Sequence, residues 1–315
     1  MLAGSQKAFS GRRLAEWKAE ALRREAEIHD PMNAIDSLLS GLIDYAGLYP
    51  PARLDMKAAV RNYLAYRRNG RSELLGRFIV DWKRLTELCE IAGDAIADMP
   101  LSVIASSAAE VSNIAQLRED GFRIESVEIK PHKLDEIAHK AARTLPETII
   151  YFEVPITPLK EEVLDSIREA GARVKIRTGG VTATAFPSSE SIAAMLIAIA
   201  GRGLAFKATA GLHHPIRGCH PFTHEPDSET GIMHGFLNLF LAAALVYFGG
   251  TEDEAKQLLN DRDAGAFRMT ADTIGWRSFQ WSTEQLRNVR REFAMSFGSC
   301  SFVEPIQDLE RMGWL

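Results

Sequence analysis

The sequence has few cysteines, no excess of basic residues and no interdomain linker. Its three cysteines, Cys89, Cys219 and Cys300, are an odd number at wide spacing, which argues against a disulfide framework and favours a reducing compartment. No leader-like segment opens the chain, so we expect a cytoplasmic protein. The net charge of -5 at pH 7 provides no basic surface for nucleic acid or an anionic membrane, so we expect neither as a partner.

The absence of a linker rich in proline, glycine and serine predicts one main domain. The chain of 315 residues, with 46% hydrophobic and 25% charged residues, has the composition of a large globular domain. Residues 1–31 combine Lys, Arg and Glu at helical spacing with a narrow apolar stripe, which predicts a peripheral N-terminal helical extension. We expect residues 32–315 to form a single domain.

Apolar strand candidates recur along this domain and alternate with amphipathic stretches long enough for helices of about three turns. The eight candidate strands are residues 42–46, 77–81, 101–105, 126–130, 148–154, 173–177, 204–209 and 273–281. Eight strands that alternate with helices predict an α/β fold of the (β/α)₈ TIM-barrel type. An open, doubly wound sheet is the alternative, because the sequence does not say whether the sheet closes.

The longest apolar run, residues 232–248, is at the lower limit of the length that spans a bilayer. It contains His234 and Asn238 and has no flanking run of Lys or Arg. We interpret it as a buried helix, or as the surface through which a homo-oligomer forms.

Charged side chains share one face of four successive strands, while apolar side chains occupy the other face. The residues on the charged face are Glu128, Lys130, Glu153, Lys175, Arg177, Lys207 and, with them, Thr209. Because side chains alternate along a strand, this face is expected to converge in the lumen of the barrel. The alternative is an ion-pair network that fills the barrel without chemistry, since buried charges need partners. Asp44 and Asp81, near the ends of the first two strands, are interpreted as cap or turn residues.

Two of these strands carry lysines in the segments VKIRTGG, at 174–180, and FKATAG, at 206–211. The pair resembles the strand lysines of class I, Schiff-base aldolases of the deoxyribose-phosphate aldolase type. The resemblance implies that Lys175 forms an imine with the substrate and that Lys207 lowers its pKa. The physical reason is general: an ammonium beside a second cation in a low-dielectric site loses its proton more easily and becomes a nucleophile.

We therefore predict an enzyme that acts on a small metabolite bearing a carboxylate or phosphate, by lyase, aldolase or isomerase chemistry. The predicted catalytic residues are Lys175, Lys207, Glu153, Glu128 and Lys130. The predicted substrate-binding residues are Arg177, Thr178, Gly179, Gly180, Thr209, His213 and His214. Backbone N–H groups at the glycine pair can cradle an anion, and a turn that needs positive φ is the plain alternative.

Residues 213–224, HHPIRGCHPFTH, form a histidine-rich loop after the seventh strand. Its histidines are expected to contact substrate or transfer protons near neutral pH, and we predict no cofactor and no bound metal. A metal-dependent hydrolase is the alternative, in which zinc or another divalent metal is held by His213, His214, Cys219, His220 and His224. A non-catalytic barrel that binds a ligand or serves in an assembly is a third possibility. Cys300 is expected to be a buried structural thiol.

Overall fold

The structure, a computed structural model, describes residues 33–129, 141, 143–145 and 148–315. The expected N-terminal extension, residues 1–31, and the predicted catalytic residue Lys130 lie outside this range.

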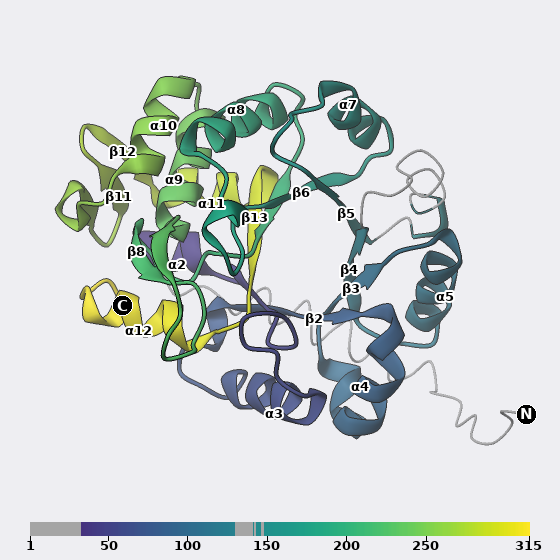
Figure 1. Cartoon of the computed structure of the whole chain (residues 1–315). Helices are drawn as coiled ribbons and strands as arrows, with labels where there is room; N and C mark the ends of the chain where they lie inside the picture. The colour runs from purple at the N-terminus through teal and green to yellow at the C-terminus, as the bar shows by residue number, and fades with distance from the viewer. Residues whose placement is uncertain (1–32, 130–140, 142, 146–147) are drawn as a thin grey trace, which may run out of the picture.

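Eight parallel strands close into a barrel at the centre of the molecule (Figure 1). Around the barrel their order is β1-β13-β7-β6-β5-β4-β3-β2, and β2 pairs with β1 to close the sheet. The strands are β1 (Ile43–Tyr45), β2 (Leu75–Asp81), β3 (Leu101–Ala105), β4 (Ile124–Ile129), β5 (Ile149–Val154), β6 (Arg173–Arg177), β7 (Phe206–Thr209) and β13 (Ala294–Ser299). The predicted TIM-type barrel is confirmed, and the alternative of an open, doubly wound sheet is wrong.

Helices surround the barrel on its outer side (Figure 1). They are α2 (Ala34–Leu39), α3 (Met56–Tyr66), α4 (Leu85–Ala92), α5 (Ala108–Glu119), α7 (Glu161–Glu169), α8 (Ser189–Ala200), α9 (Phe236–Tyr247), α10 (Glu252–Asn260), α11 (Thr283–Glu292) and α12 (Val303–Arg311). Short polar residues begin several of them: Asp55 caps α3, and Thr251 and Ser282 form capping boxes with Glu254 and Gln285. Such caps satisfy N–H groups that the first helical turn leaves unpaired.

The eighth barrel strand is β13, and not the predicted segment 273–281. That segment instead forms the hairpin of β11 (Thr273–Trp276) and β12 (Phe279–Ser282), which joins β10 (Phe267–Met269) in a separate antiparallel sheet. Its aromatic and β-branched residues favour a strand in either setting, so they could not distinguish a barrel strand from a hairpin. The sequence of β13, AMSFGS, has little strand propensity, because half of its residues are serine or glycine. Small residues are needed there, since this face of the strand points into the crowded lumen.

The apolar run at 232–248 contributes the buried helix α9. Every residue of α9 from Phe236 to Val246 is buried within one chain. Phe240 stacks on Phe206 of β7, while α10 and α8 pack on the helix from outside. A homo-oligomer through this run stays a prediction: neighbouring helices cover α9 as far as Val246, whereas Tyr247 and Phe248 at its end are exposed. The first residues of the run belong to β9 (Thr230–Met233), which pairs with β8 (Gly218–Pro221) in a hairpin.

Within the described residues, one helical stretch, Ala183–Ala200, is long and apolar enough by composition to cross a bilayer. The same composition is found in core helices of globular proteins. Ile192, Leu196 and Ile199 of α8 are fully buried in this chain, which identifies the helix as part of the packed core.

Candidate functional site

Strand register places the predicted catalytic side chains on one face of the sheet. Lys175 of β6 is the direct neighbour of Glu153 on β5 and of Lys207 on β7. Phe206, one residue before Lys207, stacks on α9 outside the barrel. The charged face therefore lines the lumen and the apolar face meets the helices, as alternation along a strand requires.

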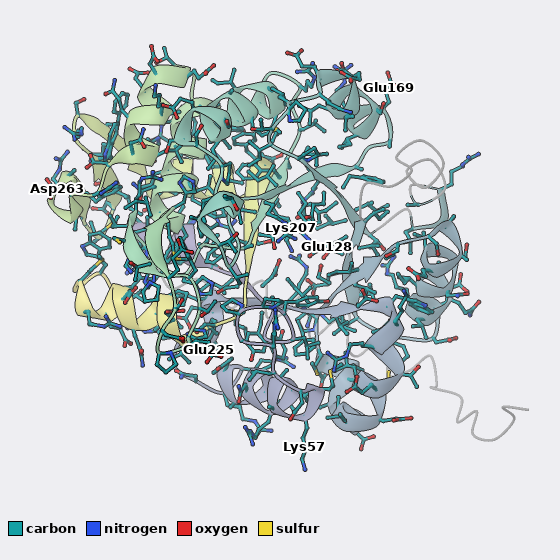
Figure 2. All side chains as sticks on the ribbon, viewed as in Figure 1. Lys57, Glu128, Glu169, Lys207, Glu225 and Asp263 are labelled. Atoms are coloured by element: carbon teal, nitrogen blue, oxygen red, sulfur yellow. The ribbon has the colours of Figure 1, made fainter. Side chains whose placement is uncertain are left out.

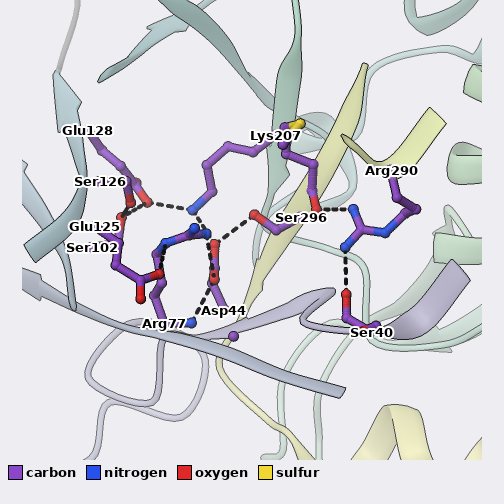
Figure 3. A network of polar contacts seen from close by, with 12 residues as sticks. Ser40, Asp44, Arg77, Ser102, Glu125, Ser126, Glu128, Lys207, Arg290 and Ser296 are labelled. Atoms are coloured by element: carbon purple, nitrogen blue, oxygen red, sulfur yellow. Dashed lines mark hydrogen bonds and ion pairs between the residues drawn. The ribbon is translucent and has the colours of Figure 1, made fainter. Parts of the chain in front are cut away.

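Lys207 lies at the centre of this lumen, between carboxylates of two other strands (Figures 2 and 3). Its Nζ donates to Asp44 Oδ2 at 2.6 Å and to Glu128 Oε1 at 2.7 Å. Further donors complete both carboxylates: Ser296 Oγ donates to Asp44 Oδ2 at 2.7 Å, and Ser102 Oγ donates to Glu128 Oε1 at 2.8 Å. Lys207 is fully buried, so these contacts replace the water that its charge has lost.

Lys175 continues the same network toward the mouth of the barrel. Its Nζ lies 2.6 Å from Glu128 Oε2 and 2.9 Å from Glu153 Oε2. Glu153 Oε1 in turn accepts a bond of 3.1 Å from Arg177 Nε. The result is a chain of alternating charges that runs from Asp44 through both lysines to Arg177.

Exposure to solvent rises along this chain. The side chains of Asp44 and Lys207 are 0% exposed, that of Lys175 is 6% exposed, and that of Glu153 is 16% exposed. The Arg177 side chain, at the last residue of β6, is 54% exposed. Because active sites of TIM barrels lie at the carboxyl ends of the strands, the open end of this chain is the end at which a substrate can enter.

The electrostatics fix the charge states at the buried end. Burial would raise the pKa of Glu128, but Lys175 and Lys207 outweigh it and lower that pKa overall. The pKa of Asp44 is likewise lowered by Lys207 and Arg77 against the effect of burial. Burial would lower the pKa of Lys207, yet Asp44 and Glu128 raise it. Lys207 is thus an ammonium and both carboxyl groups are ionised at neutral pH.

The interpretation of Asp44 as a cap or turn residue is wrong, because Asp44 is a buried member of the network. Its Oδ1 also accepts from the backbone N–H of Arg77 at 2.8 Å. Asp81 does behave as a cap, since its side chain accepts from Lys83 N.

Other residues in the lumen were not predicted from the sequence: Arg77, Ser102, Ser126, Tyr151 and Ser296. Their strand parity was a usable signal, since Ser126 is two residues from Glu128 and Tyr151 two from Glu153.

The glycine turn after β6 is held against the loop after β7. Thr178 is buried, and its hydroxyl donates to the backbone oxygen of Ala210 at 2.8 Å. A Cβ at Gly179 would lie 2.8 Å from Gly211 Cα and 2.5 Å from the Phe186 ring. Neither Gly179 nor Gly180 has positive φ, so close packing and not turn conformation explains Gly179. Anion binding at this turn stays a prediction.

Thr209 lies in the lumen beside β13. A Cβ added at Gly298 of that strand would be 3.3 Å from the hydroxyl oxygen of Thr209.

The histidine-rich loop folds over the carboxyl ends of β7 and β13. His213 Nδ1 pairs with Glu304 Oε2 at 2.9 Å, and His214 Nδ1 pairs with Asp308 Oδ2 at 2.6 Å. His220 stacks on His214 with ring centroids 3.5 Å apart. Burial and the neighbouring His214 lower the pKa of His220 to about 4. Cys219 is exposed. In the described part of the chain, no three His, Cys, Asp or Glu side chains gather as a metal site, so the set proposed for zinc is not assembled.

Two buried polar residues anchor this loop. His234 Nδ1 accepts from Arg217 Nη1 at 2.8 Å, and its Nε2 is 2.8 Å from the Pro187 oxygen. Burial lowers the pKa of His234 to about 4, which leaves a neutral ring able to accept at one nitrogen and donate at the other. Asn238 of α9 accepts from the backbone N–H of Arg217 at 2.8 Å. The loop is therefore fixed to the core, and it walls a cavity of ≈ 270 Å³ beside His213, His214, His224 and Glu304.

Comparisons with known proteins give only distant likenesses. No family model matches the sequence, and no curated protein matches it. Among solved structures, the chain is similar to QR15, an aldolase, with 19% identity and a TM-score of 0.41 over 56% of this chain and 83% of that one. It is similar to a protein from Coccidioides immitis assigned as a deoxyribose-phosphate aldolase, with 9% identity and a TM-score of 0.43 over 94% and 97% of the two chains. A third is nitroalkane oxidase from Streptomyces ansochromogenes, with 16% identity and a TM-score of 0.32 over 58% and 62%.

The strand order itself shows the closed barrel that the aldolase resemblance implies. Likenesses this distant do not identify a reaction. The chemistry has to be inferred from the contacts of the lumenal residues.

Proposed function

We propose that this barrel is an enzyme of the lyase or aldolase type, in which Lys175 forms an imine with a small anionic carbonyl compound. One observation carries the proposal: Lys175 is the more accessible of the two described lumenal lysines and lies within 2.9 Å of two carboxylates. A small part of Lys175 is exposed, whereas Lys207 is fully enclosed. A lysine must be reached by substrate before it can attack, and of these two lysines Lys175 is the one nearer to solvent.

Glu153 is the group best placed to take that proton. It contacts the Lys175 ammonium directly and is nearer to solvent than Glu128, so it can exchange the proton with water or substrate. The neutral amine then adds to the carbonyl carbon. The carbonyl oxygen takes one proton from the amine nitrogen and the one held by Glu153 and leaves as water, so that a protonated C=N remains. The C=N bond that remains can accept the electron pair of an adjacent C–C bond, which is how an imine promotes cleavage.

Lys207 has a different role in this proposal. Its raised pKa keeps it protonated, so it does not act as the nucleophile. By donating to Glu128 Oε1, it holds the other oxygen of Glu128 toward Lys175. We assign Lys207 as a positioning residue for Glu128 and, through it, for Lys175.

Arg177 supports the expectation of an anionic substrate. Its guanidinium is half exposed at the barrel mouth and uses two N–H groups on Glu153 Oε1. A guanidinium carries five N–H donors, so others are left for a carboxylate or phosphate that enters from solvent. Such an anion would also compete for Arg177 and leave Glu153 freer to take the Lys175 proton.

Reduction with borohydride tests this function. The protein is incubated with a panel of small aldehydes and keto acids, reduced, and mapped by peptide mass spectrometry. We expect a carbonyl-dependent mass increase on Lys175, and none on the exposed Lys57 under the same conditions. An adduct on Lys207 in place of Lys175, or no adduct with any member of the panel, would contradict the proposal. Product analysis of the trapped compounds then separates C–C cleavage from isomerisation.

The competing possibility is a non-catalytic barrel whose charges serve only to satisfy one another. The buried half of the network, with Asp44, Lys207 and Glu128 all paired, is compatible with that role. The two possibilities differ at Lys175, because a purely structural lysine does not form a reducible adduct at its amine.

A further inference from the structure

One side of the barrel lumen is apolar, although it lies beside the charged network. Ala46, Ile79 and Ile104 form a small hydrophobic cluster that is separate from the main core, and we call these three residues the apolar wall. Ile104 of β3 is the direct cross-strand neighbour of Glu128, so both side chains point into the lumen. A Cβ added at Gly298 of β13 would lie 3.1 Å from Ile79 Cδ1, so Ile79 also reaches into the lumen.

Solvent reaches the apolar wall at the carboxyl ends of its strands. Ala46, Ile79 and Ile104 are 9%, 4% and 6% exposed. Phe78 and Val103, which precede the two isoleucines and point outward, are 0% exposed. The outward residues are thus fully buried, while the inward ones keep contact with water at the end of the barrel where substrates bind. A small molecule that enters this end can therefore reach the wall.

The apolar wall faces Lys175 across the barrel. In the closed order β1-β13-β7-β6-β5-β4-β3-β2, the strands β1, β2 and β3 are each four places from β5, β6 and β7. Four places in a ring of eight is the diametrically opposite position, so β2 with Ile79 stands opposite β6 with Lys175. A compound joined to Lys175 from one side of the lumen therefore extends toward the apolar wall on the other.

Tyr49, in the loop after β1, adds a single donor to this side. Its ring packs on the apolar wall, and its hydroxyl oxygen is buried with no hydrogen-bond partner in the described part of the chain. Burial raises the pKa of Tyr49, and the carboxylates of Glu128 and Asp81 raise it further, so the group stays a phenol at neutral pH. A buried donor without an acceptor is costly, and an oxygen atom of a bound molecule would satisfy it.

We propose that the carbonyl compound bound at Lys175 carries a short alkyl chain without hydroxyl groups, which packs on the apolar wall while Tyr49 donates to one of the compound's oxygen atoms. The inference rests on the function proposed for Lys175 and specifies its substrate class. With Arg177 at the mouth for a carboxylate, the class is the short aliphatic 2-oxo acids. A polyhydroxylated chain is disfavoured, because its hydroxyl groups would lose water against side chains that offer no hydrogen bond.

Two 2-oxo acids of equal size test this class. 2-Oxobutanoate has a methyl group where 3-hydroxypyruvate has a hydroxyl group, and the adduct that each leaves on Lys175 after borohydride reduction is quantified by mass spectrometry. We expect the ratio of the 2-oxobutanoate adduct to the 3-hydroxypyruvate adduct to fall about tenfold in Ile104→Thr, which makes the wall polar. Ile91→Thr, on the exposed side of α4, is the control and should keep the wild-type ratio. Comparing ratios between proteins removes the difference in reactivity between the two acids.

Tyr49→Phe tests the donor separately, because it removes the hydroxyl group and keeps the ring on the wall. We expect about tenfold less adduct with both acids and an unchanged ratio between them. Wild-type amounts of adduct in Tyr49→Phe would show that the hydroxyl group does not bind the substrate. Circular dichroism melting confirms that each variant is folded.

Methyl NMR of the wild-type protein reads the wall without relying on the imine. With the isoleucine δ1 methyl groups labelled, 2-oxobutanoate should shift the signals of Ile79 and Ile104 but not that of Ile114, which is buried in α5. The shifts should persist in Lys175→Met, at higher concentrations of the acid. Wall shifts without any adduct on Lys175 would overturn the imine and support the wall. An adduct on Lys175 with no wall shifts, or with the same ratio in Ile104→Thr as in the wild type, would overturn the alkyl chain and leave the imine standing.

Discussion

Lys175 and Lys207 bind different oxygens of one carboxylate, that of Glu128. Lys207 Nζ lies 2.7 Å from Oε1 and Lys175 Nζ lies 2.6 Å from Oε2. The two lysines are therefore linked through the same anion. This geometry modifies what the paired lysines imply by resemblance, because the Lys207 charge reaches Lys175 partly cancelled by Glu128. It also makes distinct predictions for the two lysines.

Lys207→Met should destabilise the fold. The change leaves Asp44 and Glu128 ionised in a buried site with one cation fewer, and losing one partner of a buried ion pair costs about 3–5 kcal/mol. The free energy of unfolding from urea titration measures this. Lys57→Met on the surface of α3 is the control and should change it by no more than about 0.5 kcal/mol. A loss below about 1 kcal/mol at Lys207 would mean that the network is worth less than its burial implies.

Lys175→Arg should separate charge from nucleophilicity. Arginine preserves a cation beside Glu128 and Glu153, but its guanidinium stays protonated and does not form an imine. We expect a folded protein with no borohydride-trapped adduct at residue 175, and turnover reduced on the order of a hundredfold or more once a substrate is known. Lys175→Met should lose the adduct and some stability together. Turnover at the wild-type level in Lys175→Arg would rule out the imine.

The sequence contained enough to predict the barrel and the inward face of its strands. Alternation with period 2 is imposed by the backbone, so Glu128, Glu153, Lys175 and Lys207 could be assigned to one face without coordinates. Asp44 was misjudged because it is the one charged residue in the predicted strand 42–46, so no repeat of polar residues marked an inward face. Its role depends on contacts with Lys207, 163 residues away.

Other parts of the site depend on long-range contacts that no local pattern records. His213 and Cys300 are 87 residues apart and meet only because β7 and β13 are neighbours in the closed barrel. β13 itself was overlooked, since Ser296 and Gly298 give it small residues where strand propensity expects large ones. Its position follows from closure of the barrel, which is a property of the whole sheet.

Gly179→Ala tests whether the turn after β6 is required for packing. A Cβ there would contact Gly211 Cα and the Phe186 ring at distances that ordinary contacts do not reach. We expect a loss of about 1–3 kcal/mol in the free energy of unfolding, as for other overpacked sites. Gly70→Ala is the matched control, because no atom lies within 4 Å of the added carbon. If Gly179→Ala unfolds like the wild type but binds phosphate more weakly, the turn serves the predicted anion and not packing.

Acid should destabilise the protein through the same buried carboxylates. The pKa values of Asp44, Glu128 and Glu153 lie below their ordinary values of 3.8, 4.5 and 4.5, because lysine and arginine neighbours outweigh burial. The unfolded chain therefore binds more protons than the folded chain in this range, and stability rises with pH. The contribution is fully present above about pH 5 and is lost as pH falls below the ordinary value of 4.5 toward the folded values.

Urea titrations between pH 7 and pH 3 measure this loss, and Glu128→Gln isolates the share of one group. The amide cannot titrate, so the variant should be less stable than the wild type at pH 7 but should lose less stability on acidification. Exposed Glu169→Gln on α7 is the control, and its pH dependence should follow the wild type. Equal slopes for all three proteins would show that Glu128 does not keep a lowered pKa in solution, and would remove the electrostatic basis for holding Lys207 as a cation beside it.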